Sequence, residues 1–172
     1  DRLERSVEQV ALALKLDAGS LRFDIHPRDL GAIVREAVEA TEAADRSLEV
    51  DAADPVEAPV DGIHIAYVVR ELVGNAVEFS PPHSPISVRL RRDGGDALIE
   101  VADHGPGIPR DKREAVFERF ADWRPPDYED RPGAGLGLFI TRSIAHEHGG
   151  DASVSDGPAG GTMLTVRLPV EG

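Results

Sequence analysis

The alternation of helical and strand patterns along the 172-residue chain is the feature that most limits its possible folds. Apolar residues recur at helical spacing in four segments: 1–18, 30–38, 62–79 and 136–148. Apolar and polar residues alternate, as in strands, in seven short runs: 21–25, 47–50, 56–60, 86–90, 97–101, 152–155 and 163–168. The fourth and fifth runs, like the last two, are joined by glycine-containing turns typical of hairpins. This order predicts a mixed sheet with helices on one face, an α/β sandwich.

Composition narrows the function before any motif is considered. With 19 basic and 32 acidic residues the net charge is −13, so we expect no nucleic-acid partner and no contact with an anionic membrane surface. The chain has no cysteine, which excludes disulfides, zinc–thiolate sites and a cysteine nucleophile. No apolar run approaches the roughly 18 residues of a membrane span, and no signal peptide is recognisable. The length predicts one domain with a small appendage, and the start at Asp1 suggests a piece of a longer protein.

The first segment carries a helical seam. Leu3, Val7, Val10 and Leu14 recur at spacings of four, three and four, as a and d positions do in paired helices. Two heptads are too few to define a coiled coil. The helix therefore packs either on a partner helix or on its own domain, and Gly19 ends it.

Aspartates and prolines mark the limits of the next helices. Asp29 and Asp61 are predicted to cap the helices at 30–38 and 62–79, and Ser80-Pro81-Pro82 ends the second of these. A short helix is expected at 112–117, within a segment (103–134) that is rich in glycine, proline and charge.

Three segments carry residues suited to nucleotide chemistry. Glu71, Asn75 and Glu78 lie at i, i+4 and i+7 and share one helix face; their oxygens suit Mg²⁺ beside a phosphate. The run Asp103-His104-Gly105-Pro106-Gly107 follows a strand and places a carboxylate where a flat ring could approach the backbone. Gly133-Ala134-Gly135-Leu136-Gly137-Leu138 opens the helix at 136–148, where successive amides could hold phosphate oxygens. Each segment alone is equally explained by a solvated helix face or a turn.

In this order along one chain, the three segments resemble the nucleotide-binding boxes of sensor histidine kinases. Residues 71–76 resemble the N box, 103–108 the G1 box, 117–120 (with its two phenylalanines) the F box and 133–138 the G2 box. Gly160-Gly161-Thr162 before the last strand also matches, so the resemblance covers roughly residues 24–170. It implies the Bergerat ATP-binding fold shared with DNA gyrase, the ninety-kilodalton heat-shock chaperone and the mismatch-repair ATPases. That fold is a two-layer sandwich with a mostly antiparallel sheet, here preceded by a short helical stub.

The resemblance implies ATP and Mg²⁺ as ligands. Asp103 would accept a hydrogen bond from the adenine amino group, supported by Gly107 and, through water, by Thr162. Asn75 would coordinate Mg²⁺. Glu71 would be the catalytic residue that orients or polarises the attacking group, and it could also reach the metal through water.

The resemblance also implies a phosphate site and a mobile lid. Backbone amides of the G2 box would hold the β and γ phosphates, and residues 110–132 would close over the nucleotide. Phe117 and Phe120 are expected to anchor this lid in apolar pockets. The full set of further nucleotide-binding candidates is Gly105, Ile108, Phe117, Phe120, Gly133, Gly135, Leu136, Gly137 and Leu138.

One position departs from the family pattern. Many members carry Lys or Arg three residues after the N-box Asn, whereas this chain has Glu78. A carboxylate there would repel phosphates unless it faced Mg²⁺ or turned away. We therefore expect the cationic contact to come from Arg119, Arg124 or Arg131 of the lid, each of which could equally be a solvated surface arginine.

None of the chain's six histidines stands in the sequence context of a histidine kinase phosphoacceptor. His146 and His148 have a spacing that could bind a metal, but a helix C-terminal cap is the favoured interpretation. Residues 1–19 resemble the end of the second dimerisation helix, and 20–172 the catalytic ATP-binding domain. The resemblance thus implies a cytoplasmic catalytic domain that cannot phosphorylate itself. Its partners would be its own dimerisation domain and a response regulator, in a homodimeric full-length protein.

Two other functions are compatible with the same site. An anti-sigma-factor-type serine kinase would use the ATP site with a bound protein serine as acceptor, although the helical stub argues against it. A non-catalytic nucleotide-binding regulatory module would bind nucleotide without turnover, and Glu78 is its only support.

Overall fold

The strands form two sheets of unequal size. In the larger sheet, β2 (Leu48–Asp51), β4 (Ile86–Asp93), β5 (Asp96–Ala102), β7 (Thr162–Pro169) and β6 (Asp151–Asp156) lie side by side in that order. Only the β2–β4 pair is parallel. β1 (His26–Asp29) and β3 (Glu57–Val60) form a separate antiparallel ladder. The computed structural model describes residues 2–131 and 133–171, so the domain limits expected at Asp1 and Gly172 and the lid end expected at Pro132 lie outside it.

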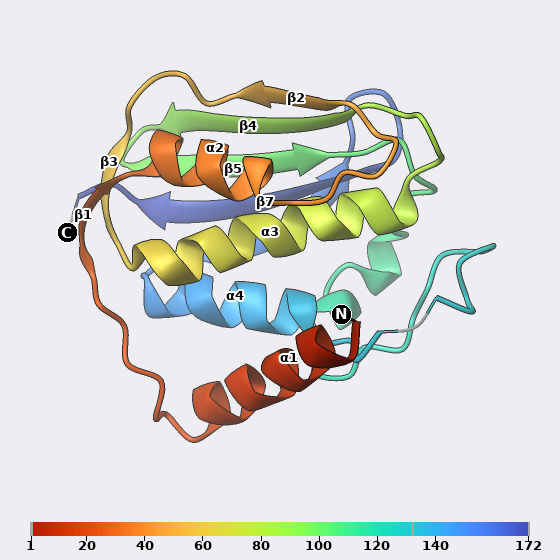
Figure 1. Ribbon diagram of the computed structural model, residues 1–172, viewed down its shortest axis with the longest axis horizontal. Coiled ribbons are helices and arrows are strands. Elements are labelled where there is room, and N and C mark those ends of the chain that lie inside the picture. The colour runs from red at the N-terminus through yellow and green to blue at the C-terminus, as the bar shows by residue number, and fades with distance from the viewer. Residues whose placement is uncertain (1, 132, 172) are drawn as a thin grey trace.

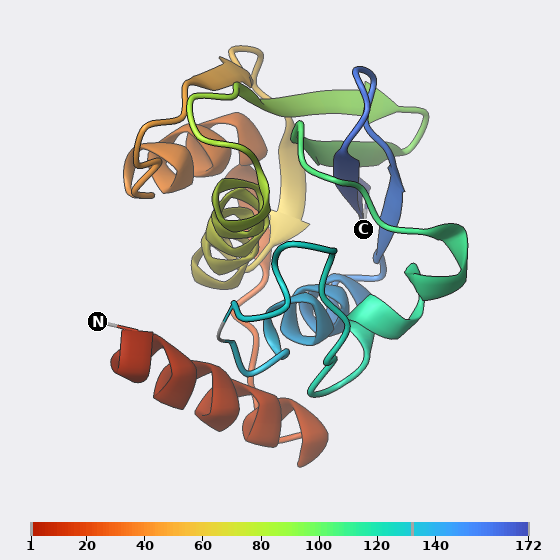
Figure 2. The ribbon, with the colours of Figure 1, turned by 90° about the vertical axis from the view of Figure 1, so that its right-hand side faces the viewer.

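Three helices cover one face of the larger sheet. They are α2 (Leu30–Glu39), α3 (Gly62–Phe79) and α4 (Gly137–Glu147) (Figure 1). The first helix, α1 (Arg2–Asp17), lies outside this layer against α4, and the segment before α4 loops across the ends of α3 and α4 (Figure 2). The predicted two-layer α/β sandwich with helices on one face is confirmed. Among the described residues, no helix combines the length and the apolar character needed to cross a bilayer.

The core follows directly from the apolar patterns. In β4, Ile86, Val88 and Leu90 are buried against the helices, while the residues between them face away, as expected for a sheet with one covered face. On α3 the predicted apolar stripe is buried: Ile65, Val68, Val69, Leu72 and Ala76. Burial of this stripe fixes the rotation of α3, so that Glu71, Asn75 and Glu78 on another face of the helix line the cleft described below.

Both predicted caps are present. The Asp29 carboxylate accepts a hydrogen bond from the Gly31 amide at 2.9 Å, and that of Asp61 accepts one from the His64 amide at 3.1 Å. The helix expected at 112–117 is instead two 3₁₀ turns, η1 (Arg110–Lys112) and η2 (Ala115–Phe117). Such turns are the usual form of very short helical segments.

The strand predicted at 21–25 is wrong, because these residues form no ladder and the strand begins at His26. Their alternation reflects one-sided packing of a linker. The ring of Phe23 lies 4.9 Å from that of His64 and 5.4 Å, edge-on, from that of His148. The linker is thereby held at the end of the molecule where α3 begins and α4 ends.

His148 joins α3 and α4 at this end. Its Nε2 accepts a hydrogen bond from the Asp61 amide at 3.0 Å, and its Nδ1 lies 2.7 Å from the Ile144 carbonyl oxygen. His148 is the C-cap residue of α4, in agreement with the favoured interpretation. Among the residues the structure describes, no group of three or more histidine or acidic side chains is placed to hold a metal ion.

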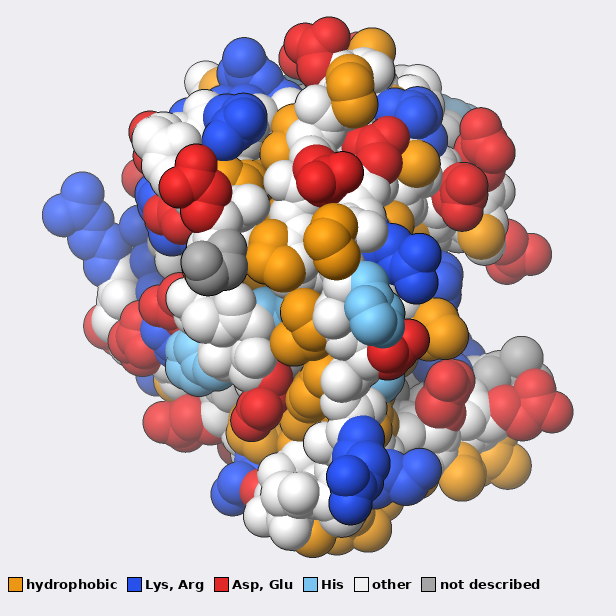
Figure 3. Space-filling view, turned by 90° about the vertical axis from the view of Figure 1, so that its left-hand side faces the viewer, with side chains coloured by type: hydrophobic (Ala, Val, Ile, Leu, Met, Phe, Trp, Pro, Cys, Tyr) orange, Lys and Arg blue, Asp and Glu red, His pale blue; other side chains and the backbone are white. Residues whose placement is uncertain are grey.

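The surface opposite the lid segment mixes both signs of charge. Acidic and basic side chains are interspersed around apolar ones on this face, without a large field of one sign (Figure 3). The net charge of −13 is therefore not concentrated here.

Candidate active site

The N-box face of α3 opens into a cleft of about 1720 Å³. Glu71, Asn75 and Glu78 line it together, as their spacing predicts. The other walls come from α1, the start of α4 and the loop between β5 and α4. Of the other predicted residues, the lining includes Asp103, Gly107, Ile108, Gly133, Gly135, Gly137, Leu138 and Thr162.

Glu71 is the most enclosed acid of this cleft, with only 6% of its surface exposed. Its Oε2 accepts a hydrogen bond from Gln9 Nε2 at 3.1 Å, and Arg5 Nη2 lies 3.5 Å from its Oε1. Burial raises the pKa of Glu71, and the charge of Arg5 with the hydrogen bond from Gln9 partly offsets this rise. Both partners lie on α1, which therefore reaches the centre of the cleft.

The start of α4 leaves room for this carboxylate. A Cβ atom at Gly137 would lie 2.5 Å from Glu71 Oε2, so a larger residue would collide with it. No side chain caps the N-terminus of α4, so its first amides are without a side-chain acceptor there. Amides of this kind, together with the helix dipole, attract phosphate oxygens.

Gly135 lines the cleft and also supports the loop that follows the F box. Its φ is +69°, and a Cβ atom there would lie 2.4 Å from the Ala121 carbonyl oxygen. The Ala121 amide donates to the Gly135 carbonyl at 3.2 Å. Gly135 thus lets the loop after the F box pack directly on the segment that leads into α4.

Asp103 also lines the cleft. Its Oδ1 accepts hydrogen bonds from the Gly105 amide at 2.8 Å and from the Thr162 amide at 3.2 Å. Burial raises the pKa of Asp103, against the lowering effect of these two bonds. Because both bonds go to Oδ1, the remaining oxygen is available to a donor bound in the cleft.

The two phenylalanines of the F box differ in packing. Phe117 is buried, and the guanidinium of Arg142 lies 4.7 Å from its ring centre. Phe120 is 65% exposed with φ +56°, so the expected apolar anchor at this residue is wrong. Its backbone turns the chain into the loop that Gly135 supports, which directs the side chain outward. Gly105, Phe117, Phe120 and Leu136 lie outside the cleft lining.

The three lid arginines are also placed differently from one another. Arg119 forms an ion pair with Asp17 and lies 4.8 Å above the Phe139 ring, outside the cleft lining. Arg124 lines the cleft and donates to the Ala121 and Trp123 carbonyls at 2.9 Å each. Arg131 also lines it.

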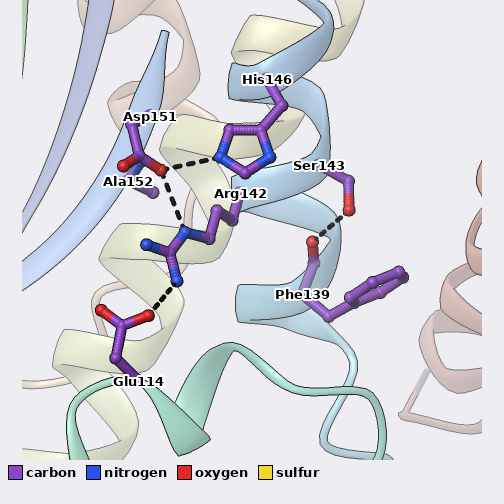
Figure 4. A network of polar contacts seen from close by, with 7 residues as sticks. All are labelled: Glu114, Phe139, Arg142, Ser143, His146, Asp151 and Ala152. Atoms are coloured by element: carbon purple, nitrogen blue, oxygen red, sulfur yellow. Dashed lines mark hydrogen bonds and ion pairs between the residues drawn. The ribbon is translucent and has the colours of Figure 1, made fainter.

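A polar network fixes the base of the lid to the sheet. Arg142 on α4 donates to Glu114, beside η2, at 2.8 Å and to Asp151 on β6 at 3.0 Å (Figure 4). His146 Nε2 lies 2.9 Å from the same Asp151 oxygen. Partial burial alone would raise the pKa of Asp151, but its bonds from Arg142, the Ala152 amide and His146 bring it down to about 2.

Sequence reasoning missed several residues of the cleft. The single tryptophan, Trp123, lines it, as do Arg5 and Gln9 of the first helix. No local motif marks Arg5 or Gln9, because their proximity to Glu71 depends on how α1 folds back over α4. Trp123 had a weak signal, as an isolated aromatic within a loop of charged residues and prolines.

The donor set at the N-box face fits a magnesium ion. Asn75 and Glu71 supply an amide and a carboxylate oxygen one helical turn apart, and both line the cleft beside the start of α4. Mg²⁺ commonly takes one or two protein oxygens and completes its shell with phosphates and water. An acid at Glu78 in the same lining adds a further oxygen donor.

These features are those of a sandwich-fold ATPase domain. The chain matches the family model for histidine kinase-, DNA gyrase B- and HSP90-like ATPases over residues 60–172, and it belongs to this family. Its relatives place it more narrowly, as the ATPase domain of a two-component sensor histidine kinase.

The relatives are similar along nearly the whole chain. Signal transduction histidine-protein kinase AfsQ2 of Streptomyces coelicolor is 34% identical over 98% of this chain and 31% of its own length. The probable sensor histidine kinase TcrY of Mycobacterium tuberculosis is 33% identical over 100% and 36%. The chain therefore spans about a third of the length of these curated relatives.

Solved structures share the fold. The mycobacterial sensor histidine kinase MprB superposes with a TM-score of 0.75 at 34% identity, over 84% of this chain and 97% of that one. Full-length ShkA in complex with AMPPNP superposes with a TM-score of 0.78 at 25% identity, over 97% of this chain and 35% of that one.

Proposed function

We propose that this domain binds Mg²⁺-ATP in the described cleft and donates the γ-phosphate to a histidine on a dimerisation domain. The observation that carries the proposal is the arrangement within one cleft. Its lining includes a buried carboxylate with one uncommitted oxygen, Asp103, and also Asn75, Glu71 and the first residues of α4, whose N-terminus has no side-chain cap. The similar ShkA was solved in complex with AMPPNP, which supports an adenine nucleotide as the ligand here.

Each group would have a distinct task. Asp103 accepts a hydrogen bond from the adenine amino group, and the backbone of Gly107 lies beside the adenine ring. The first amides of α4 hold the terminal phosphates, so that phosphate binding needs few basic side chains. When bound, Mg²⁺ would neutralise developing charge on the phosphates, with Asn75 as its protein ligand.

Phosphoryl transfer depends mainly on alignment and charge stabilisation. In this proposal Glu71 orients the attacking imidazole and accepts its proton as the nitrogen bonds to the γ-phosphorus. The bond from that phosphorus to the bridging oxygen breaks, and ADP leaves with the electron pair. Enclosure of Glu71 by α1 and α4 keeps its carboxylate in one position for this step.

The partners follow from the same proposal. Residues 1–19 would be the end of a dimerisation helix, with 20–172 as the catalytic domain. The stripe Leu3, Val7, Val10 and Leu14 is exposed on α1, which supports pairing with another helix in a homodimeric, cytoplasmic kinase region. A response regulator would then take the phosphoryl group.

A transfer assay tests the proposal. The domain is mixed with a separately produced dimerisation domain of a related kinase and ATP labelled in the γ-phosphate. We expect acid-labile, base-stable label on a histidine of the second domain, and none when that histidine is replaced. Acid-stable label on serine of an added anti-sigma-factor partner would instead support a serine kinase.

A regulatory module without turnover is the second candidate, favoured by Glu78 in the cleft lining. Saturable ATP binding without transfer to any acceptor would support it. Restoring transfer with Glu78→Lys would identify this acid as the cause.

A further inference from the structure

The phosphate end of the cleft is bordered by acids on α3. Glu71 and Glu78 both line it, and the family's basic residue is absent at position 78. A triphosphate placed here would meet uncompensated negative charge beyond what one Mg²⁺ offsets. A cation near Asn75 would therefore strengthen binding, and the question is which side chain supplies it.

The lid arginines are already engaged elsewhere. Arg119 lies outside the cleft against Asp17 and Phe139. One nitrogen of Arg124 is used by two carbonyls of its own loop, and Arg131 lies 5.6 Å above the Tyr128 ring. We therefore consider the cations that other elements contribute to the lining of the same cleft.

Arg5 of α1 lies at the required place. Its Nη2 is 3.5 Å from Glu71 Oε1, and a Cβ atom at Gly74, the residue before Asn75, would be only 2.8 Å from that nitrogen. The guanidinium thus rests on the turn of α3 that carries Asn75. Its side chain is 56% exposed, so donors remain open toward the cleft.

Gln9 holds the same region from one turn further along α1. Its Nε2 donates to Glu71 Oε2 at 3.1 Å and would lie 3.6 Å from a Cβ atom at Gly137. Arg5 and Gln9 therefore face the junction of α3 with the start of α4, where the proposed function places the terminal phosphates.

We propose that Arg5 binds the phosphate groups of the nucleotide, supplying from α1 the positive charge that the N box lacks at position 78. This inference rests on the proposed function. Arginine suits the task because its planar guanidinium can bind carboxylate and phosphate oxygens at the same time. This role of Arg5 would make α1 a wall of the nucleotide site as well as a connecting helix.

Nucleotide titrations test the role of Arg5. Trp123 lines the cleft and is the only tryptophan, so its fluorescence reports binding directly. With Mg²⁺ present, Arg5→Gln should raise the Kd for ATP about 10-fold, a change of about 1.4 kcal/mol. The Kd for adenosine should not change, because adenosine has no phosphate. Lys15→Gln removes an equal charge from an exposed position of the same helix and should alter neither Kd.

A second variant changes the position of Arg5 through its contact on α3. Gly74→Ala should displace the flexible Arg5 guanidinium and so weaken the binding of ATP more than the binding of adenosine. Alanine is well tolerated in the helix α3 itself. Equal weakening of ATP and adenosine by Arg5→Gln would show a structural role of α1 and overturn the inference. An unchanged Kd for ATP in Arg5→Gln would also overturn the inference. Failure of the unaltered protein to bind either ligand would overturn the proposed function and this inference with it.

Discussion

Asp103 shows how a single side chain can be prepared for a ligand before the ligand arrives. One of its oxygens is held by two backbone amides, and burial raises its pKa. A carboxylate in such a place is costly unless a further donor reaches it. The adenine amino group would be that donor in the proposed complex.

Replacing Asp103 by Asn tests this assignment at the residue scale. The amide can still accept from Gly105 and Thr162, but its second polar atom is a donor and so offers the adenine amino group no acceptor. We expect the affinity for ATP to fall about 10- to 100-fold, on the order of 1.5–3 kcal/mol. Isothermal titration measures this change, and thermal unfolding of the free variant checks its fold. An unaltered affinity would reject the role in adenine binding.

Glu71→Gln separates binding from transfer. The amide keeps the size and the contact with Gly137 but cannot take a proton, so phosphotransfer should fall by about 10²–10⁴-fold. Binding of ATP, followed through Trp123, should remain within a few-fold of the unaltered protein. Transfer at the normal rate would show that Glu71 is not the proton acceptor.

Sequence reasoning located residues within motifs but not their partners from distant segments. The positions of Glu71, Asn75 and Asp103 in one cleft were predictable from box order. The Gln9–Glu71 hydrogen bond joins residues 62 positions apart, and no spacing rule reaches that far. Phe120 was misjudged for a related reason: its positive φ turns the side chain outward, and the sequence carries no glycine there to signal it.

At the element scale, η2 and α4 are joined by Arg142. The side chain packs on Phe117 and bonds to Glu114 and Asp151. The base of the lid is therefore fixed to the sheet, whereas one backbone hydrogen bond, from the Ala121 amide to the Gly135 carbonyl, joins the loop beyond Phe120 to the segment before α4. Motion of the lid would begin after the F box.

Arg142→Met should loosen this base. Partly exposed ion pairs and a cation–π contact together suggest a loss of about 1–2 kcal/mol in the free energy of unfolding at pH 7, measurable by urea denaturation. The folded pKa of Asp151, about 2, lies below its unfolded value near 3.9. Its stabilising effect is thus complete above about pH 3.9 and is lost as the pH falls through about 2.

The difference in the free energy of unfolding between the unaltered protein and Arg142→Met should therefore become smaller as the pH falls from about 3.9 to about 2. Arg110→Met, on η1, provides a control that removes a charge outside this network. A constant difference across the same pH range would contradict the assignment of the low pKa to Arg142.

Helices and strands were predictable from the sequence where the residues with an apolar burial pattern are also those whose backbone forms the helix or strand hydrogen bonds. α3 and the β4–β5 hairpin follow their apolar patterns closely. The segment 21–25 has the alternation of a strand, yet it is a linker whose Phe23 fits between two histidines. The true strand, His26–Asp29, contains a proline and pairs Pro27 with Pro59 in a two-stranded ladder. Each strand of a two-stranded ladder is an edge strand, where proline is tolerated. The proline in the sequence therefore argued against a strand at His26–Asp29, although the topology permits one there.

At the scale of the whole molecule, ligand binding and folding are linked. The cleft is built from α1, α3, α4 and the lid segment, so a nucleotide that binds only the folded chain stabilises all of them together. At an ATP concentration 100-fold above its Kd, the gain is about 2.7 kcal/mol. For a chain of this length we expect a rise in Tm of about 5–10 °C.

Differential scanning fluorimetry with Mg²⁺-ATP, and with GTP as the matched control, measures this rise. Asp103 favours the adenine amino group over the guanine carbonyl, so GTP should give a smaller shift. Equal shifts would indicate that the base is not read at Asp103.

The order of the large sheet has a consequence for how the chain is made. β7 (Thr162–Pro169) is synthesised after the other strands of this sheet, yet it lies between β5 and β6 and pairs with both. Until it arrives, β5 presents an open edge and a largely apolar strand, the kind of surface that associates with other chains. A ribosome adds about 5–20 residues per second, so this exposure lasts several seconds. Closure of the sheet must therefore await β7, and release or truncation before β7 would leave a chain prone to aggregation.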